Sequence, residues 1–195
     1  MARFTSRGCL SALFILAGLS AAWAQKNIAE ASSFIGNLEY TFEIGRHESL
    51  VKLKRSKDAR IAPFASDGCS GGLSAGWTLI ASALPAFSER HGDHPPWERC
   101  CLKHDRVYHT GGARSADAQA SFEARRTADR QLRQCVIQVG EKRAPELMAE
   151  YGLSGVEVAW LYRRIADTMY AAVRSGGAPC TGLSWRWGFG WPHCQ

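Results

Sequence analysis

Two adjacent cysteines in the middle of the chain, Cys100 and Cys101, most constrain what it can fold into. His104 and Asp105 each follow one of these cysteines at a distance of four residues, and residues four apart share one face of a helix. The pattern therefore predicts a helix fastened by disulfides on two sides, with a histidine and a carboxylate projecting side by side. Such a rigid helix is a suitable platform for a general base next to a metal-binding carboxylate.

The first residues of the chain predict export. A positively charged start, an apolar run over residues 9–22 and a small-x-small pattern that ends at Ala24 are typical of a signal peptide. The apolar run is short for a transmembrane helix. We therefore expect residues 1–24 to be a signal peptide, cleaved near Ala24, and the protein to be secreted or periplasmic.

The number of cysteines and the net charge agree with export from the cytoplasm. Seven cysteines less Cys9 in the signal peptide leave six, and an even number in an exported chain predicts three disulfides. The spacing leaves their pairing open. The net charge of +6 becomes a modest basic excess without Arg3 and Arg7, which in an exported protein suits anionic lipid better than nucleic acid. We expect a monomer that binds phospholipid membranes or micelles and no nucleic acid.

The apolar pattern predicts a mainly helical chain. Apolar and polar residues alternate from Leu38 to Ile44, which is typical of a strand, so we expect residues 25–66 to form an N-terminal segment with a possible small β-hairpin. One domain is expected over residues 67–195. Apolar periodicity and capping residues predict its helices over residues 77–84, 97–110, 115–140 and 154–176.

Particular residues mark the ends of the longer helices. Ser115 is a suitable N-cap for the helix that we expect to end at Gly140. Ser154 and Glu157 have the spacing of a capping box, which predicts the start of the last helix.

A carboxylate falls on the apolar face of the helix over residues 115–140. Asp129 shares this face with Leu132, and a buried carboxylate needs a hydrogen-bond or charge partner. A histidine on the facing helix is the natural partner, because a carboxylate on one ring nitrogen leaves the other free as a base. We therefore expect His104 to pair with Asp129, and Cys135 lies close enough to that face to tie the two helices together.

A glycine-rich segment, Gly68–Gly72, predicts a loop rather than a helix or a central strand. Glycines allow a loop to turn its carbonyl oxygens toward a cation, and calcium takes about six to eight oxygen ligands, backbone carbonyls included. Asp105 is the expected carboxylate ligand. Calcium is therefore the predicted cofactor.

Together these motifs resemble the secreted phospholipase A2 family. The Cys-Cys-x-x-His-Asp run at residues 100–105 is similar to the active-site helix of that family. Tyr108 stands where the family has a tyrosine that hydrogen-bonds the catalytic aspartate, and Asp129 stands where it has the aspartate that orients the histidine. The run Cys69–Gly72 resembles the family's calcium loop. The resemblance covers residues 67–135.

The resemblance implies a fold with two long antiparallel disulfide-linked helices and a calcium loop, to which this chain adds a C-terminal helix. The catalytic residues that it implies are His104, Tyr108 and Asp129. The metal ligands that it implies are the Asp105 carboxylate and the carbonyls of Gly68, Ser70 and Gly72. The disulfides that it implies are Cys69–Cys101 and Cys100–Cys135, which leave Cys180–Cys194 as the third.

The activity that the resemblance implies is calcium-dependent hydrolysis of the sn-2 ester of glycerophospholipids, with His104 taking a proton from the attacking water. Ser70 replaces a glycine of the family pattern and Ala128 replaces a cysteine. These departures affect the expected calcium affinity and substrate preference more than the expected fold.

Other functions compete with this one. A catalytically weak or inactive phospholipase A2-like module would bind membranes or a protein partner. Residues 68–72 also fit Gly-x-Ser-x-Gly, which would make Ser70 the nucleophile of a serine esterase, but that motif needs a strand before it and a large parallel sheet. A zinc site is disfavoured because adjacent cysteines are poorly spaced for zinc.

The C-terminal end is rich in tryptophan, with four large aromatic residues between Trp185 and Trp191. Tryptophan favours the boundary between membrane and water, so this segment is a candidate interfacial anchor. The same rings are equally suited to cap the helices as part of the core.

Overall fold

The computed structural model describes residues 27, 30, 34, 36–66, 68–69, 73–112 and 115–194. The chain divides into two compact units, one up to Phe42 and one from Glu43 onward. In the described residues all regular secondary structure is helical and no strand occurs, so the predicted mainly α class is confirmed. The expected signal peptide over residues 1–24 lies outside the described residues.

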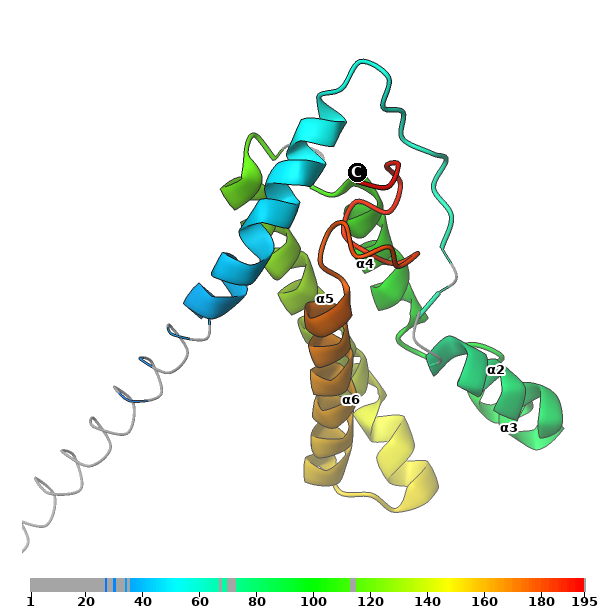
Figure 1. Cartoon of the computed structure of the whole chain (residues 1–195). Coiled ribbons are helices and arrows are strands. Elements are labelled where there is room, and N and C mark those ends of the chain that lie inside the picture. The colour runs from blue at the N-terminus through cyan, green and yellow to red at the C-terminus, as the bar shows by residue number, and fades with distance from the viewer. Residues whose placement is uncertain are drawn as a thin grey trace, which may run out of the picture. The chain divides into compact units, whose positions relative to one another are not determined.

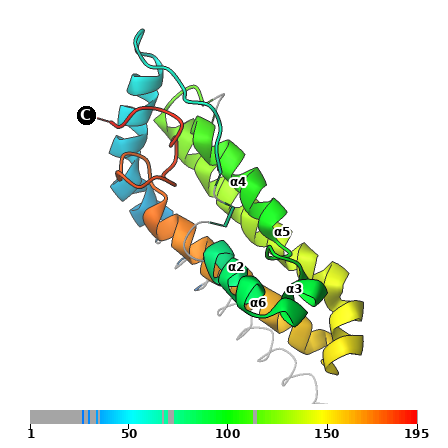
Figure 2. The same ribbon diagram turned by 90° about the vertical axis from the view of Figure 1, so that its right-hand side faces the viewer.

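Most of the described residues lie in helices (Figure 1). Residues 36–54 are helical and form the N-terminal helix. The helices that follow are α2 (Leu73–Ala83), α3 (Pro85–His91), α4 (Glu98–Thr110), α5 (Ala118–Tyr151) and α6 (Gly155–Gly176). Helices α5 and α6 form a long antiparallel pair, and α4 lies along α5 (Figures 1 and 2). An irregular C-terminal segment, residues 177–194, follows α6.

The N-terminal helix corrects the expected β-hairpin. Glu43, His47, Leu50 and Val51 are buried, and residues three to four positions apart mark one face of a helix. The alternating pattern was misleading, because Phe42, one of its apolar members, is 76% exposed. The buried face packs on α5 and on the C-terminal segment, and this tertiary packing overrides the local β preference.

Helix α5 is longer than the sequence predicted. Its N-cap is Asp117, whose carboxylate accepts a backbone hydrogen bond from the first turn (2.7 Å), and not Ser115. The helix also continues through Gly140, which was expected to end it. A Cβ atom at Gly140 would lie 2.3 Å from Cγ of Tyr162 on α6. This glycine therefore permits a close approach of two helices rather than ending one.

Disulfides hold the helices and loops together. The three bridges are Cys69–Cys101, Cys100–Cys135 and Cys180–Cys194. The first ties the segment before α2 to α4, the second ties α4 to α5, and the third closes the C-terminal segment. The first two are the pairs that the resemblance implied, and the third is the pair that remained. Helix α4 is therefore anchored on two sides, as its adjacent cysteines predicted.

The aromatic residues of the C-terminal segment contribute to the core. Trp187 is fully buried, and its indole N–H donates to Oγ of Ser121 (3.0 Å). The indole N–H of Trp191 donates to the Thr110 carbonyl (3.0 Å). Arg186, 4% exposed, donates to carbonyls of its own segment. Of the two roles considered for this segment, capping the helices fits these contacts better than anchoring in a membrane.

None of the helices in the described part of the chain combines the length and the apolar character needed to cross a bilayer.

Candidate active site

The structure brings His104 of α4 and Asp129 of α5 together. Nε2 of His104 lies 2.8 Å from Oδ1 of Asp129, and the two side chains are only 5% and 0% exposed. When Asp129 is ionised, Nε2 carries the proton and donates it, so Nδ1 is the nitrogen with a free lone pair. The arrangement therefore presents Nδ1 as a base.

Tyr108 is a second hydrogen-bond partner of Oδ1 of Asp129. Its hydroxyl donates to Oδ1 of Asp129 (2.7 Å), and it accepts a hydrogen bond from Nε of Arg125 (3.1 Å). Its ring lies 4.1 Å from the ring of His104, centroid to centroid. Burial, with the negative charge of Asp129, raises the pKa of Tyr108 well above its ordinary value, so the hydroxyl remains a donor.

The ionised form of Asp129 is strongly favoured. Burial alone opposes the charge, but the hydrogen bond from His104 and the positive charge of Arg125 outweigh it and lower the pKa of Asp129. The guanidinium of Arg174 adds a bond to Oδ2 (2.9 Å). For His104, burial opposes the imidazolium, but the hydrogen bonds to Asp105 and Asp129 outweigh that effect and raise its pKa.

Asp105 links His104 to the segment that precedes α2. Nδ1 of His104 lies 3.7 Å from Oδ1 of Asp105. The hydroxyl of Ser66 donates to Oδ2 of Asp105 and accepts from the backbone N–H of Gly68 (3.1 Å). Gly68 has a φ of 81°, a left-handed conformation suited to glycine. Ser66 was not predicted as a site residue, since it precedes the recognisable motif and carries no spacing signal.

The described part of the predicted calcium site fits a hard cation. Gly68 and Asp105 line one cavity, whereas Ser70 and Gly72 lie outside the described residues. Within those residues, the ring of His104 is the ion-pair partner of Asp105, and no lysine or arginine neutralises this carboxylate. No cluster of three or more histidine, cysteine or acidic side chains occurs there either. Calcium needs no such cluster, because carbonyl oxygens supply most of its ligands in a site of this kind.

A small, mainly apolar cavity of about 200 Å³ opens beside His104 and Asp105. Its walls come from the segment before α2, from α4 and α5, from one face of α6, and from the C-terminal segment. The lining residues are Gly68, Cys69, Cys101, His104, Asp105, Leu132, Thr168, Met169, Ala172, Val173 and Trp185. If an apolar ligand chain lay in this cavity, a polar group at the end of that chain would lie next to His104.

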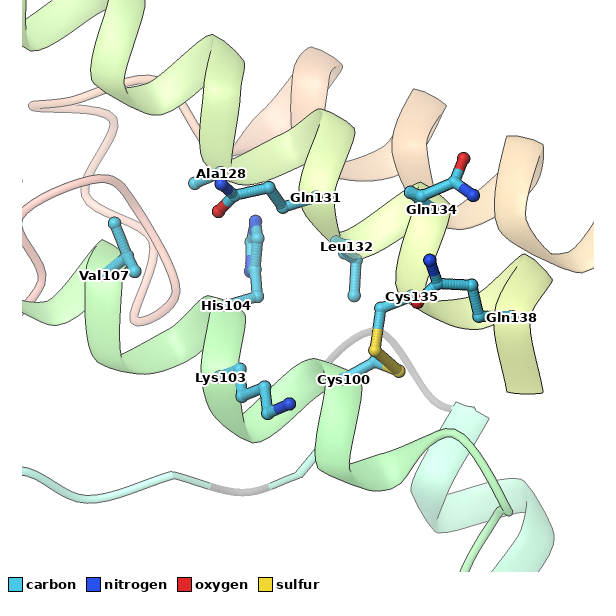
Figure 3. Close-up of a pocket in the computed structure, with 10 residues that line it drawn as sticks. All are labelled: Cys100, Lys103, His104, Val107, Ala128, Gln131, Leu132, Gln134, Cys135 and Gln138. Carbon is cyan, nitrogen blue, oxygen red and sulfur yellow. A yellow bond between two sulfur atoms is a disulfide. The ribbon is translucent and has the colours of Figure 1, made fainter. Parts of the chain in front are cut away.

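A larger cavity of about 410 Å³ runs between α4 and α5. In Figure 3 the ring of His104 projects from α4 toward α5, among side chains of mixed polarity. The lining residues are Cys100, Lys103, His104, Val107, Ala128, Gln131, Leu132, Gln134, Cys135 and Gln138. His104 therefore borders an apolar cavity and a more polar one.

Three charged residues behind Asp129 were missed by the sequence analysis. Arg125 precedes Asp129 by one helical turn and could have been found from that spacing. Arg174 and Glu43 give no such signal, because they approach from α6 and from the N-terminal helix.

No family model, no curated protein and no solved structure matches this chain. The chemistry of the site must therefore be inferred from its own residues and distances.

Proposed function

We propose that the chain is a calcium-dependent phospholipase A2, which hydrolyses the sn-2 ester of glycerophospholipids at a membrane surface after export from the cell. The setting of His104 carries the proposal: Nε2 is hydrogen-bonded to buried Asp129, Nδ1 lies 3.7 Å from Oδ1 of Asp105, and the residue lines an apolar cavity. A base, a carboxylate for a cation and apolar walls suit an amphiphilic ester. The three disulfides agree with an oxidising compartment.

In the proposed reaction, Nδ1 of His104 takes a proton from a water molecule while the water oxygen attacks the ester carbonyl. Oδ1 of Asp129 keeps the ring oriented and stabilises the imidazolium, as the aspartate of a serine-protease triad does. The hydroxyl of Tyr108 fixes the same carboxylate oxygen. The imidazolium then returns its proton to the departing alkoxide.

Asp105 and the Gly68 carbonyl, with the carbonyls of Ser70 and Gly72, are the proposed calcium ligands. Calcium, when bound, supplies positive charge for the substrate phosphate and for the oxyanion that forms on the ester. Ser66 holds Oδ2 of Asp105 and so restricts the rotation of that carboxylate.

The apolar cavity is the proposed site of an acyl chain. Met169 and Val173 of α6 line it together with Leu132 of α5, and His104 and Asp105 stand at its polar border. Burial of an acyl chain contributes roughly 0.8 kcal/mol per methylene group, so these walls supply affinity while the polar groups fix the ester.

The serine esterase alternative loses support. The described residues contain no strand that could precede Ser70 in a parallel sheet. The non-catalytic membrane-binding module remains the competing function, and the same experiment separates it from the enzyme.

The test is fatty-acid release from mixed phospholipid vesicles by the disulfide-bonded protein, with calcium or with chelator. His104→Gln should lower sn-2 hydrolysis by ~10²–10⁴-fold, the usual contribution of a general base. His94→Gln is the matched control, because His94 lies on the surface and pairs with Glu98 away from the site. Wild-type protein that binds vesicles but releases no fatty acid in calcium would support the binding module instead.

A further inference from the structure

Two arginines are buried with two carboxylates behind His104. We call Glu43, Arg125, Asp129 and Arg174 the charge cluster; their side chains are 10%, 0%, 0% and 5% exposed. Buried charges require partners, because water no longer stabilises them. Two positive and two negative charges balance one another in this cluster.

We propose that Arg174, held in turn by Glu43, is a positioning residue that orients Asp129 and through it His104. This inference rests on the proposed function, in which His104 is the base. NH1 of Arg174 donates to Oδ2 of Asp129 (2.9 Å). Oδ1 is thereby left for Nε2 of His104 (2.8 Å) and the hydroxyl of Tyr108 (2.7 Å). The carboxylate cannot rotate about its side-chain bond without losing its bond to Arg174.

The position of Arg174 is itself fixed from two directions. Its NH2 donates to Oε1 of Glu43 (3.3 Å). Its backbone is held by Arg125, whose NH2 donates to the carbonyls of Val173 (2.7 Å) and Arg174 (2.9 Å) in the last turn of α6. The Val173 carbonyl also accepts from the backbone N–H of Gly177 (2.9 Å), so Arg125 adds a second hydrogen bond there. Arg125 also supplies a partner for the Arg174 carbonyl and so anchors the segment that carries Arg174.

Glu43 joins the two guanidinium groups. Its Oε2 accepts from NH1 of Arg125 and its Oε1 from NH2 of Arg174. Without this carboxylate, two like charges would face each other in a poorly solvated interior, where their repulsion is large. Glu43 therefore makes the N-terminal helix part of the proposed active site, although 131 residues separate it from Arg174.

The principal variant is Arg174→Met, which removes the guanidinium but keeps a long side chain. Arg133→Met is the matched control, since Arg133 also joins α5 to α6, through Asp167 (2.6 Å), in a half-exposed ion pair. With monomeric short-chain phospholipid and saturating calcium, we expect Arg174→Met to lower kcat by about 10–100-fold, as the loss of an orienting partner does. KM should change by less than about threefold, and Arg133→Met should leave both near the wild-type values.

Two further variants separate positioning from folding. Glu43→Gln combined with Arg174→Met keeps the buried charges balanced, so it should restore thermal stability but not kcat. Arg174→Lys keeps the charge without the planar fork and should recover only part of kcat. If Arg174→Met does not fold, the charge-balanced double variant carries the measurement. A folded variant that lacks the Arg174 guanidinium and keeps wild-type kcat would overturn the inference.

A spectroscopic measurement separates this inference from the proposed function. The Nε2–H of His104, bound to a buried carboxylate, should give a downfield imidazole N–H resonance in the calcium-free protein. Arg174→Met and the charge-balanced double variant should broaden or shift this resonance, and Arg133→Met should not. If no variant moves it, Arg174 does not position the pair. If the resonance responds but the wild type hydrolyses no phospholipid, the positioning stands and the proposed function fails.

Discussion

Two regions of this molecule differ in whether they bury charged side chains or expose apolar ones. The helices α4, α5 and α6 enclose the charge cluster and are tied by the Cys100–Cys135 disulfide. In the helical hairpin of α2 and α3, the residues from Leu73 to Ser88 carry no charge, and the charged residues Glu89 and Arg90 lie near the end of α3. The hairpin leaves Leu79 70% exposed and Leu84 57% exposed.

The hairpin contacts the rest of the described chain through aromatic rings and a surface ion pair. Trp77 packs against Trp97 at a ring distance of 5.8 Å, and Arg90 forms an ion pair with Glu150 (3.0 Å). Buried charges tolerate few substitutions because each needs a particular partner, whereas exposed aliphatic side chains tolerate many. The interior therefore carries the proposed chemistry, whereas the hairpin exposes apolar side chains, which we expect to contact the bilayer if the proposed function is right.

The largest expected effect is loss of stability in the charge cluster. Arg125→Met should destabilise the protein by about 3–5 kcal/mol, because it leaves Glu43 buried with a missing partner and removes two hydrogen bonds to carbonyls in the last turn of α6. Urea unfolding at neutral pH measures the change. The control is Arg130→Met, since Arg130 donates to Thr127 at the surface and should change stability by less than about 0.5 kcal/mol. Equal effects of the two variants would contradict the difference between interior and surface.

Removal of the disulfide between α4 and α5 comes next. Replacing Cys100 and Cys135 together with serine should cost about 2–4 kcal/mol, measured by urea unfolding. The same double change at Cys180 and Cys194 should cost less, because that bridge closes a loop of 14 residues rather than 35. A larger loss at the second bridge would show that the C-terminal segment, and not the α4–α5 pair, dominates stability.

Stability should also fall as the pH is lowered. Burial opposes the charge of Glu43, but its hydrogen bonds with His47 and Arg125 prevail and lower its pKa, as partners do for Asp129. Carboxyl groups with a lowered pKa stabilise the fold above their ordinary pKa, and that contribution is lost as the pH falls through the folded value.

Two histidines affect the same titration in opposite directions. Burial lowers the pKa of His47, so stability is lost as the pH falls below its ordinary value. The raised pKa of His104 adds stability on acidification, which is complete once the pH is below its ordinary value. We therefore expect the free energy of unfolding, measured in urea, to decrease from pH 6 to pH 3 by roughly 1.4 kcal/mol for each unit of pKa shift, with the carboxyl contributions lost below pH 4.5. A constant free energy of unfolding below pH 4.5 would contradict the ionised state of the charge cluster.

The smallest effect on stability is expected in the hairpin. Leu79→Glu and Leu84→Glu should each change the free energy of unfolding by less than about 0.5 kcal/mol, since both side chains are exposed. Their binding to anionic phospholipid vesicles, measured by sedimentation, should weaken about tenfold or more, because burial of a leucine contributes about 1.5–3 kcal/mol. Val156→Glu is the control, being 80% exposed on α6. Equal losses of binding for all three variants would remove the hairpin from the membrane surface.

Local spacing allowed part of the site to be predicted. The helix expected over residues 97–110 matches α4, and the capping box of Ser154 and Glu157 begins α6. The pairing of His104 with Asp129 followed from helical periodicity, since a buried carboxylate needs a partner. The disulfide pairs required the family resemblance in addition, because cysteine spacing alone left them open.

Other features depended on contacts between distant parts of the chain. The β-hairpin prediction was wrong, because an alternating pattern gave no sign of the helix face that Glu43 and His47 share. Gly140 was interpreted as a helix end, but the ring of Tyr162 occupies the space of its missing side chain.

The sequence by itself determined the helix with His104 and Asp105 on adjacent faces, since backbone periodicity alone sets which side chains lie together. Only the tertiary structure decided that Arg174 and Glu43 stand behind Asp129. Their positions depend on how separate helices pack, and no local pattern encodes which distant charge will neutralise a buried one.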